Sequence, residues 1–205
     1  MDDDEFPPAP ICLISQEGEQ LQVHADGMAL LGRLGTTPVA TVAVAGMYRT
    51  GKSFFLNQLC GAPGFKVGHT SESCTRGIWV WVVPSTFWSP SDHSGTRLLL
   101  LDTEGLASID QDETYDAKVF SLAILLSSFF IYNSMGVIDE AAIDRLFLVG
   151  ELTKNVCLNA DRPGAVKSPA TAPNIACAVL PGCASFRVSS KRAGCSGGRR
   201  EQRGP

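Results

Sequence analysis

The sequence lacks a hydrophobic run long enough to cross a membrane. Its longest apolar stretch, Val119 to Tyr132, has 14 residues and contains serines, whereas a transmembrane helix needs about 20 apolar residues. The stretch instead predicts the end of a buried helix that runs into a buried strand. The first residues are acidic, the reverse of the basic start of a signal peptide. We therefore expect no transmembrane segment and a cytoplasmic location.

Paired cysteines are also lacking. The chain has 7 cysteines, an odd number, and no two of them form a C-x-x-C pair. Zinc sites and disulfide frameworks depend on such spacing or on an even count. The pattern is typical of reduced thiols in a cytosolic protein, so neither kind of site is expected.

Positive charge is scarce in the first three quarters of the chain. Residues 1–153 hold 8 Lys and Arg against 19 Asp and Glu, whereas residues 154–205 hold 9 basic residues and 2 acidic ones. An acidic body argues against a nucleic-acid-binding face, because phosphate backbones attract basic surfaces. The basic tail could contact RNA, a membrane or an acidic partner, but basic segments of this kind are more often simply exposed to water. No nucleic-acid partner is therefore expected.

What the sequence does have is an alternation of buried strands and helices. Two short strands are expected within 11–24, around a Glu-Gly turn, and then a helix that Gly35 ends. Further apolar runs lie at 41–46, 78–83, 97–102 and 128–133, and helical patterns lie at 53–61, 115–127 and 139–153. Apolar runs without polar alternation are typical of strands buried on both faces. We therefore predict an α/β fold, with a mainly parallel sheet flanked by helices.

Composition divides the chain into three regions. Residues 1–10 are predicted to be a flexible acidic lead, and residues 11–153 carry the α/β pattern. Residues 154–205 are rich in Pro, Gly and Ser and show no durable period, which predicts disorder. A short strand at 174–180 stays open as an exception.

One glycine turn matches a phosphate-binding loop at every fixed position. Gly46 to Ser53 reads G-x-x-x-x-G-K-S, with an apolar strand before it and a helical pattern after it. Glycines let the backbone N–H groups wrap a phosphate, and the helix start adds positive potential. In such a loop Lys52 reaches the β- and γ-phosphates, and Ser53 ligates Mg²⁺. The sequence therefore predicts a P-loop that binds a nucleoside triphosphate with Mg²⁺.

A second motif, D-T-E-G, follows the apolar run at 97–102. Asp102 ends that run, and parallel strands bring their carboxyl ends to the same edge of a sheet. We therefore expect Asp102 beside the P-loop, where it holds Mg²⁺ through water. Gly105 is expected to donate its N–H to the γ-phosphate.

Between the two motifs, "GHTSESCTRG" offers hydroxyl groups just before a strand. Nucleotide switches place there a Mg²⁺ ligand that orders when a triphosphate binds. Thr75 is the candidate, with Thr70 as the alternative. Ser73 and Thr75 also have a plainer interpretation as ordinary loop hydroxyls.

Four segments together resemble one family. They are "VAGMYRTGKSFFLNQL", "CTRGIWVW", "LLLLDTEGL" and "AILLSSFFIYNSMGVIDEAAIDRL", and the resemblance covers roughly Ile11 to Thr153. This part is similar to the guanylate-binding proteins, large GTPases related to atlastins and other dynamin-like proteins. Glu104 favours this family over the atlastins, which usually carry glutamine there. The resemblance implies a Ras-like core with Mg²⁺-dependent GTP hydrolysis, often stimulated when two GTPase domains form a homodimer or heterodimer.

The resemblance also implies roles for single residues. Arg49 would act as an arginine finger within its own chain; from the residues alone, the alternative is a side chain that faces solvent or forms a surface ion pair. Ser73 would orient the attacking water, with the help of Glu104 through a hydrogen-bond chain. The expected nucleotide contacts are Gly46, Tyr48, Arg49, Thr50, Gly51, Lys52, Ser53, Phe54 and Gly105.

A guanine-recognition motif is absent from the sequence. Small GTPases use N-K-x-D and the guanylate-binding proteins use an Arg-Asp pair after a strand; here Asp161 precedes Arg162 in a proline-bounded turn. GTP is therefore assigned over ATP by resemblance alone. We expect a GTPase domain that is incomplete at its C-terminal side, in a truncated form. The alternatives are a nucleotide-binding module that no longer hydrolyses and pairs with relatives, or a nonfunctional fragment.

Overall fold

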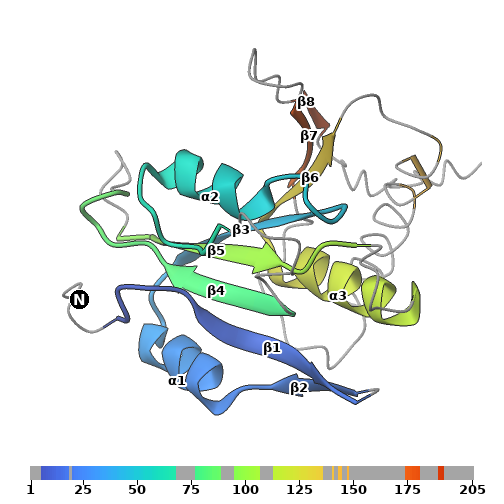
Figure 1. Cartoon of the computed structure of the whole chain (residues 1–205). Helices are drawn as coiled ribbons and strands as arrows, with labels where there is room; N and C mark the ends of the chain where they lie inside the picture. Colours follow the sequence, from blue (N-terminus) through green and yellow to red (C-terminus); the bar gives the residue numbers. More distant parts are fainter. Residues whose placement is uncertain are drawn as a thin grey trace, which may run out of the picture.

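The computed structural model describes residues 6–18, 20–67, 77–88, 95–106, 113–135, 174–180 and 189–191, with single positions at 140, 143, 144 and 147. Its elements are β1 Ile11–Glu17, β2 Gln20–Val23, α1 Ala25–Leu34, β3 Val39–Gly46, α2 Lys52–Cys60, β4 Ile78–Val82, β5 Arg97–Thr103, α3 Glu113–Leu126, β6 Phe129–Met135, β7 Asn174–Leu180 and β8 Ser189–Lys191. The strands form one sheet in the order β2-β1-β4-β5-β3-β6-β7-β8 (Figure 1). Within the first 135 residues, strands and helices therefore follow the alternation that the sequence predicts.

The sheet is mixed, where the sequence predicts a mainly parallel one. The pairs β5–β3, β3–β6 and β6–β7 are parallel, whereas β4 is antiparallel to both β5 and β1. β4 is nonetheless buried along almost its whole length. A continuous apolar run thus indicates burial on both faces and does not indicate the direction of the strand. The parallel strands β5, β3 and β6 are the part that positions the predicted site.

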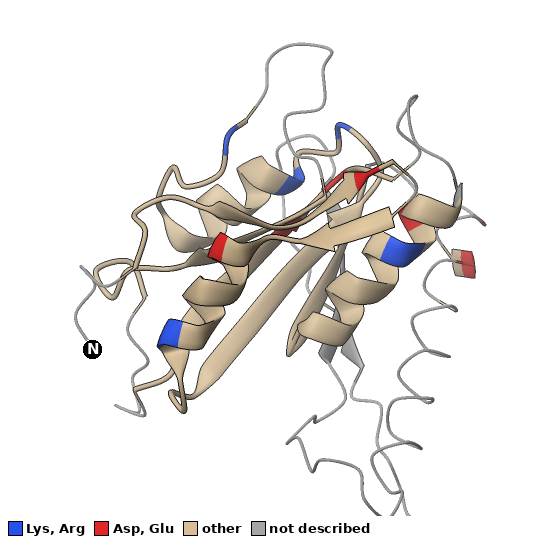
Figure 2. Ribbon diagram, turned by 90° about the horizontal axis from the view of Figure 1, so that it is seen from below, with Lys and Arg blue, Asp and Glu red and all other residues tan. Residues whose placement is uncertain are grey.

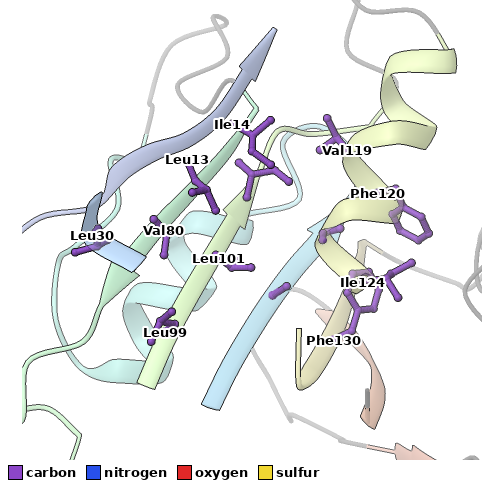
Figure 3. Packing of buried hydrophobic residues seen from close by; sticks show 14 of the residues in the cluster. Leu13, Ile14, Leu30, Val80, Leu99, Leu101, Val119, Phe120, Ile124 and Phe130 are labelled. Atoms are coloured by element: carbon purple, nitrogen blue, oxygen red, sulfur yellow. The ribbon is translucent and has the colours of Figure 1, made fainter. Parts of the chain in front are cut away.

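Helices cover both faces of the sheet (Figure 1). Along β5, Leu98 and Leu100 belong to the cluster packed with α2, while Leu99 and Leu101 belong to the cluster packed with α1 and α3. This alternation follows from the two-residue period of a strand. Figure 3 shows the second cluster, in which Phe120 and Phe130 meet edge to face with ring centroids 5.4 Å apart.

The ends of the helices follow the predicted signals. α1 ends at Leu34, and the next residue, Gly35, has a positive φ of 54°, which favours glycine. α2 begins after Gly51 and ends before Gly61, and both glycines are left-handed. α3 ends at Leu126 and β6 begins at Phe129, so the long apolar stretch is a helix end that runs into a strand, as predicted. In the described part of the chain, no helix has the length and apolar character needed to cross a bilayer.

The two ends of the chain hold more structure than composition suggests. Phe6 is buried, and the Arg97 guanidinium lies 5.5 Å from the centre of its ring, so part of the expected flexible lead packs on the domain. β7 forms at 174–180, where the sequence left a short strand as a possibility, and it pairs with β6 along its whole length. β8 was not expected. Disorder for the rest of 154–205 stays a prediction, and most of the helical pattern at 139–153 lies outside the described residues.

The packing of Phe130 gives a test of this fold. Phe130→Ala removes a fully buried ring from the cluster beneath α3, and we expect it to lower the free energy of unfolding by about 3–5 kcal/mol. Leu125→Ala, at a half-exposed position of the same helix, should cost less than about 1 kcal/mol. Urea denaturation of both variants measures the difference. Equal losses would contradict the packing of β6 against α3.

Candidate functional site

The chain between β3 and α2 forms the predicted loop, and its backbone explains its glycines. A Cβ atom on Gly46 would lie 2.0 Å from the carbonyl oxygen of Asn133 on β6, so no larger residue fits. Gly51 has a φ of 81° and caps the start of α2. Arg49, with a φ of 60°, is the one non-glycine residue of the described chain in the left-handed region. Such strain is typical of functional loops.

The loop is held from two sides by neighbouring strands. On the β5 side, the Tyr48 N–H donates to the Leu106 carbonyl at 2.9 Å, and the Leu106 N–H donates to the Gly46 carbonyl at 3.0 Å. On the β6 side, Asn133 Nδ2 donates to the Thr50 carbonyl at 2.9 Å. Sequence reasoning missed Asn133. The sequence shows Asn133 only as a polar residue at the end of a buried strand, a pattern that indicates neither its partner nor its role.

Lys52 is almost fully buried at the first position of α2. Its Nζ donates to the Met47 carbonyl at 3.0 Å, and the Thr50 hydroxyl donates to the same oxygen at 2.9 Å. Burial lowers the pKa of Lys52, while Asp102, Glu104 and Asp116 oppose that shift. In Figure 2, the charged positions lie mostly on helices and loops, and most of the strand ribbon carries no charge. The ammonium group is thus held inside the loop, at the positive end of a helix, where an anion would bind.

Asp102 lies beside the P-loop, where the sequence predicts it, and contacts Ser53 directly. The Ser53 hydroxyl donates to Asp102 Oδ2 at 2.5 Å, and Asp102 is fully buried. A hydroxyl and a carboxylate are the hard oxygen donors that Mg²⁺ takes from proteins, usually alongside waters and substrate phosphates. This donor set fits Mg²⁺. The described residues hold no cluster of three His, Cys, Asp or Glu side chains that could bind a metal without such help.

Glu104 lies next to this pair but faces other partners. Its Oε2 accepts from the Gly77 N–H at 3.0 Å and from the Tyr115 hydroxyl at 2.7 Å. The pKa of Tyr115 is raised by burial and by its bond to Glu104. Gly105 touches the loop, since a Cβ there would lie 2.4 Å from the Tyr48 Cα. The structure therefore brings Glu104 and Gly105 to the site, and it adds Tyr115, which the sequence reasoning did not single out.

The remaining predicted residues fall into two groups. Arg49 is exposed at the surface of the loop, and Phe54 is half exposed on α2. The exposure of Arg49 is compatible both with a finger that closes on a ligand and with a side chain that faces solvent. Ser73, Thr75 and the alternative Thr70 lie outside the described residues.

Comparison with known proteins decides the family. The model of the family "Guanylate-binding protein, N-terminal domain" matches residues 18–175. This chain belongs to the guanylate-binding protein family. The resemblance drawn from the loop, the D-T-E-G motif and the segments around them is confirmed.

Two relatives show how far the match extends. Mouse guanylate-binding protein 7 is 46% identical over 150 residues, which are 72% of this chain and 23% of the relative. Human guanylate-binding protein 5 is 47% identical over 146 residues, 70% of this chain and 24% of the relative. The chain therefore spans about a quarter of the length of these relatives.

Among solved structures, the chain is similar to Era from Aquifex aeolicus. The TM-score is 0.36 at 16% identity, over 62% of this chain and 38% of that one. A similarity with so low a score supports no conclusion about this chain. The architecture described above bears out the predicted P-loop fold by itself: a central strand, a glycine loop at its carboxyl end and a helix, in a mixed sheet.

The burial of Lys52 leads to a prediction about stability. Lys52→Met keeps the length of the side chain and removes a buried charge, so we expect the free energy of unfolding of the ligand-free protein to rise at neutral pH. The pKa of Lys52 is lower in the folded state than the ordinary value of 10.5, so the wild type gains stability as pH rises between the two values. The advantage of the variant should therefore shrink across that window. Denaturation of both proteins from neutral to alkaline pH measures this, and a less stable variant would mean that the ammonium is net stabilising.

Proposed function

We propose that this chain binds GTP with Mg²⁺ and hydrolyses it. The observation that carries the proposal is the buried ammonium of Lys52, which the P-loop holds beside the Ser53–Asp102 pair. Burial of a charge is costly unless a partner of opposite charge compensates it. The phosphates of a nucleotide would supply that partner, and the name of the family, guanylate-binding protein, supports guanine as the base.

Binding would use the loop as a cradle. The N–H groups between Gly46 and Ser53 would surround the β- and γ-phosphates, with Lys52 turning from the Met47 carbonyl to the phosphate oxygens. Tyr48, Thr50 and Phe54 belong to the same contact set by resemblance, and Gly105 would donate its N–H to the γ-phosphate. Ser53 and Asp102 would hold Mg²⁺, with Thr75 as a further ligand. The metal would neutralise part of the phosphate charge.

Hydrolysis would depend on side chains that stabilise developing charge and orient water. Arg49 would reach the transferred phosphoryl group as a finger within the same chain, because positive charge there is most valuable in the transition state. Ser73 would orient the attacking water. Glu104 would support that arrangement through hydrogen bonds, which is compatible with its contacts to Gly77 and Tyr115.

A second candidate is a module that binds nucleotide without hydrolysing it. The exposure of Arg49 is compatible with it, because an exposed arginine that does not close on the ligand leaves binding intact and removes the finger. In either case pairing with a second guanylate-binding domain, in a homodimer or heterodimer, and a cytoplasmic location are part of the proposal.

Loss of the ammonium group should abolish most triphosphate affinity. A hydrogen bond to a charged group contributes about 1.5–3 kcal/mol, so Lys52→Ala should weaken binding of a labelled GTP analogue by about 10- to 100-fold. The exposed Lys66 offers a control, since Lys66→Ala removes the same charge from outside the loop. Fluorescence titration with GTP and ATP analogues measures both affinity and base preference. Equal affinity for the two analogues would remove guanine from the proposal, and no binding by the wild type would remove the function.

Loss of the finger should affect turnover and not binding. Arginine fingers raise kcat by factors on the order of a thousand or more, so Arg49→Ala should keep the affinity of the wild type and slow GTP hydrolysis by about that factor. Single-turnover phosphate release measures the rate. Arg33→Ala, at an exposed position of α1, serves as the control for loss of surface charge. Normal hydrolysis by Arg49→Ala would show that the loop arginine is not a finger, and a wild type that binds without turnover would select the second candidate.

A further inference from the structure

A single carboxylate oxygen joins three elements next to the P-loop. Oε2 of Glu104 accepts from Gly77, directly before β4, and from Tyr115, in the first turn of α3. The Glu104 N–H also donates to the Gly77 carbonyl at 2.8 Å. Glu104 itself follows the end of β5. These bonds therefore tie the end of β5 to the start of β4 and to α3.

Gly77 is also confined from the opposite side. A Cβ at this position would lie 2.0 Å from the Ile14 carbonyl oxygen on β1, and the φ of 74° favours glycine. The start of β4 is thus wedged between β1 and Glu104. In the sequence, only Arg76 separates Gly77 from Thr75, the proposed Mg²⁺ ligand. A shift of Gly77 would therefore pass along the backbone toward Thr75 and Ser73, whose proposed roles require exact positions.

Tyr115 is suited to a permanent role as a donor. Its ring is buried and its pKa is raised, so the hydroxyl keeps its proton across the neutral range. Glu104 is buried as well, and a buried carboxylate is costly unless donors satisfy its oxygens. Without the tyrosine hydroxyl, Oε2 would keep only the Gly77 amide among its bonds described above. The carboxylate would then be held by one donor instead of two, and the contact of the tyrosine hydroxyl with the Gly77 backbone would be lost as well.

We propose that Tyr115 is a positioning residue for GTP hydrolysis, whose hydroxyl fixes the Glu104 carboxylate against the Gly77 amide. The inference rests on the proposed GTPase function. Tyr115 does not touch the nucleotide in this scheme. It acts through Glu104, so its loss should change the rate of the chemical step while triphosphate affinity is kept.

The test uses the full chain with Tyr115→Phe, which removes one oxygen atom and keeps the buried ring. We expect kcat for GTP to fall about tenfold, because a charge-assisted hydrogen bond is lost, while the Kd of a non-hydrolysable GTP analogue stays within about twofold. In a Glu104→Ala background, Tyr115→Phe should change kcat by less than about twofold, because the two residues act as one unit. Additive effects, or an unchanged kcat in Tyr115→Phe, would overturn the proposal.

A second measurement separates this inference from the proposed function. Amide hydrogen exchange followed by NMR on the ligand-free chain should show the Gly77 amide exchanging about tenfold faster in Tyr115→Phe than in the wild type. Tyr132→Phe is the matched control, because it removes a hydroxyl from another buried tyrosine, on β6, and should leave the Gly77 amide unchanged. A wild type without GTP turnover would reject the proposed function alone. Unaltered exchange at Gly77 in Tyr115→Phe would reject the role of Tyr115, whatever the turnover.

Discussion

The buried ammonium of Lys52 is the constraint on which the site depends. A lysine at the start of a helix and under a tight loop loses most of its hydration, and its lowered pKa reflects that loss. The loop compensates only in part, through the Met47 carbonyl, and three carboxylates oppose the pKa shift through longer-range attraction. The ligand-free protein therefore holds a charge whose best partner is an anion from outside. The proposed affinity for phosphate and the expected loss of intrinsic stability follow from the same feature.

The sheet makes this arrangement possible because β3 lies between two parallel neighbours. β5 and β6 both end beside the loop, so each can support it with a backbone or side-chain bond. The bond from Asn133 to Thr50 and the pair of bonds between Leu106 and the loop are the result. Apolar packing on both faces fixes these strands, which lets a strained residue such as Arg49 persist in the loop. The core thus supports the loop on which the proposed function depends.

The sequence predicts those parts of the site that depend on local patterns. The loop from Gly46 to Ser53 and the acidic residue at the end of β5 follow from spacing and from a strand that precedes them, and both lie where expected. Asn133 and Tyr115 could not be predicted, because their roles arise from contacts between residues that are 83 and 11 positions apart. The direction of β4 escaped prediction for a related reason, since burial on both faces leaves the same apolar run in either direction. β8 is too short to leave a pattern.

The balance of charge around Lys52 argues for a cation in the working site. Asp102, Glu104 and Asp116 all act on one ammonium group, so the surroundings of the loop are acidic before any phosphate enters. A triphosphate would bring further negative charge beside a buried carboxylate, and repulsion in a medium of low dielectric is strong. Lys52 and the helix end cannot compensate both. A divalent cation between Asp102 and the phosphates would turn that repulsion into attraction, and Ser53 and Asp102, the two residues proposed to hold it, already contact each other. Triphosphate and metal should therefore bind together, each raising the affinity of the other.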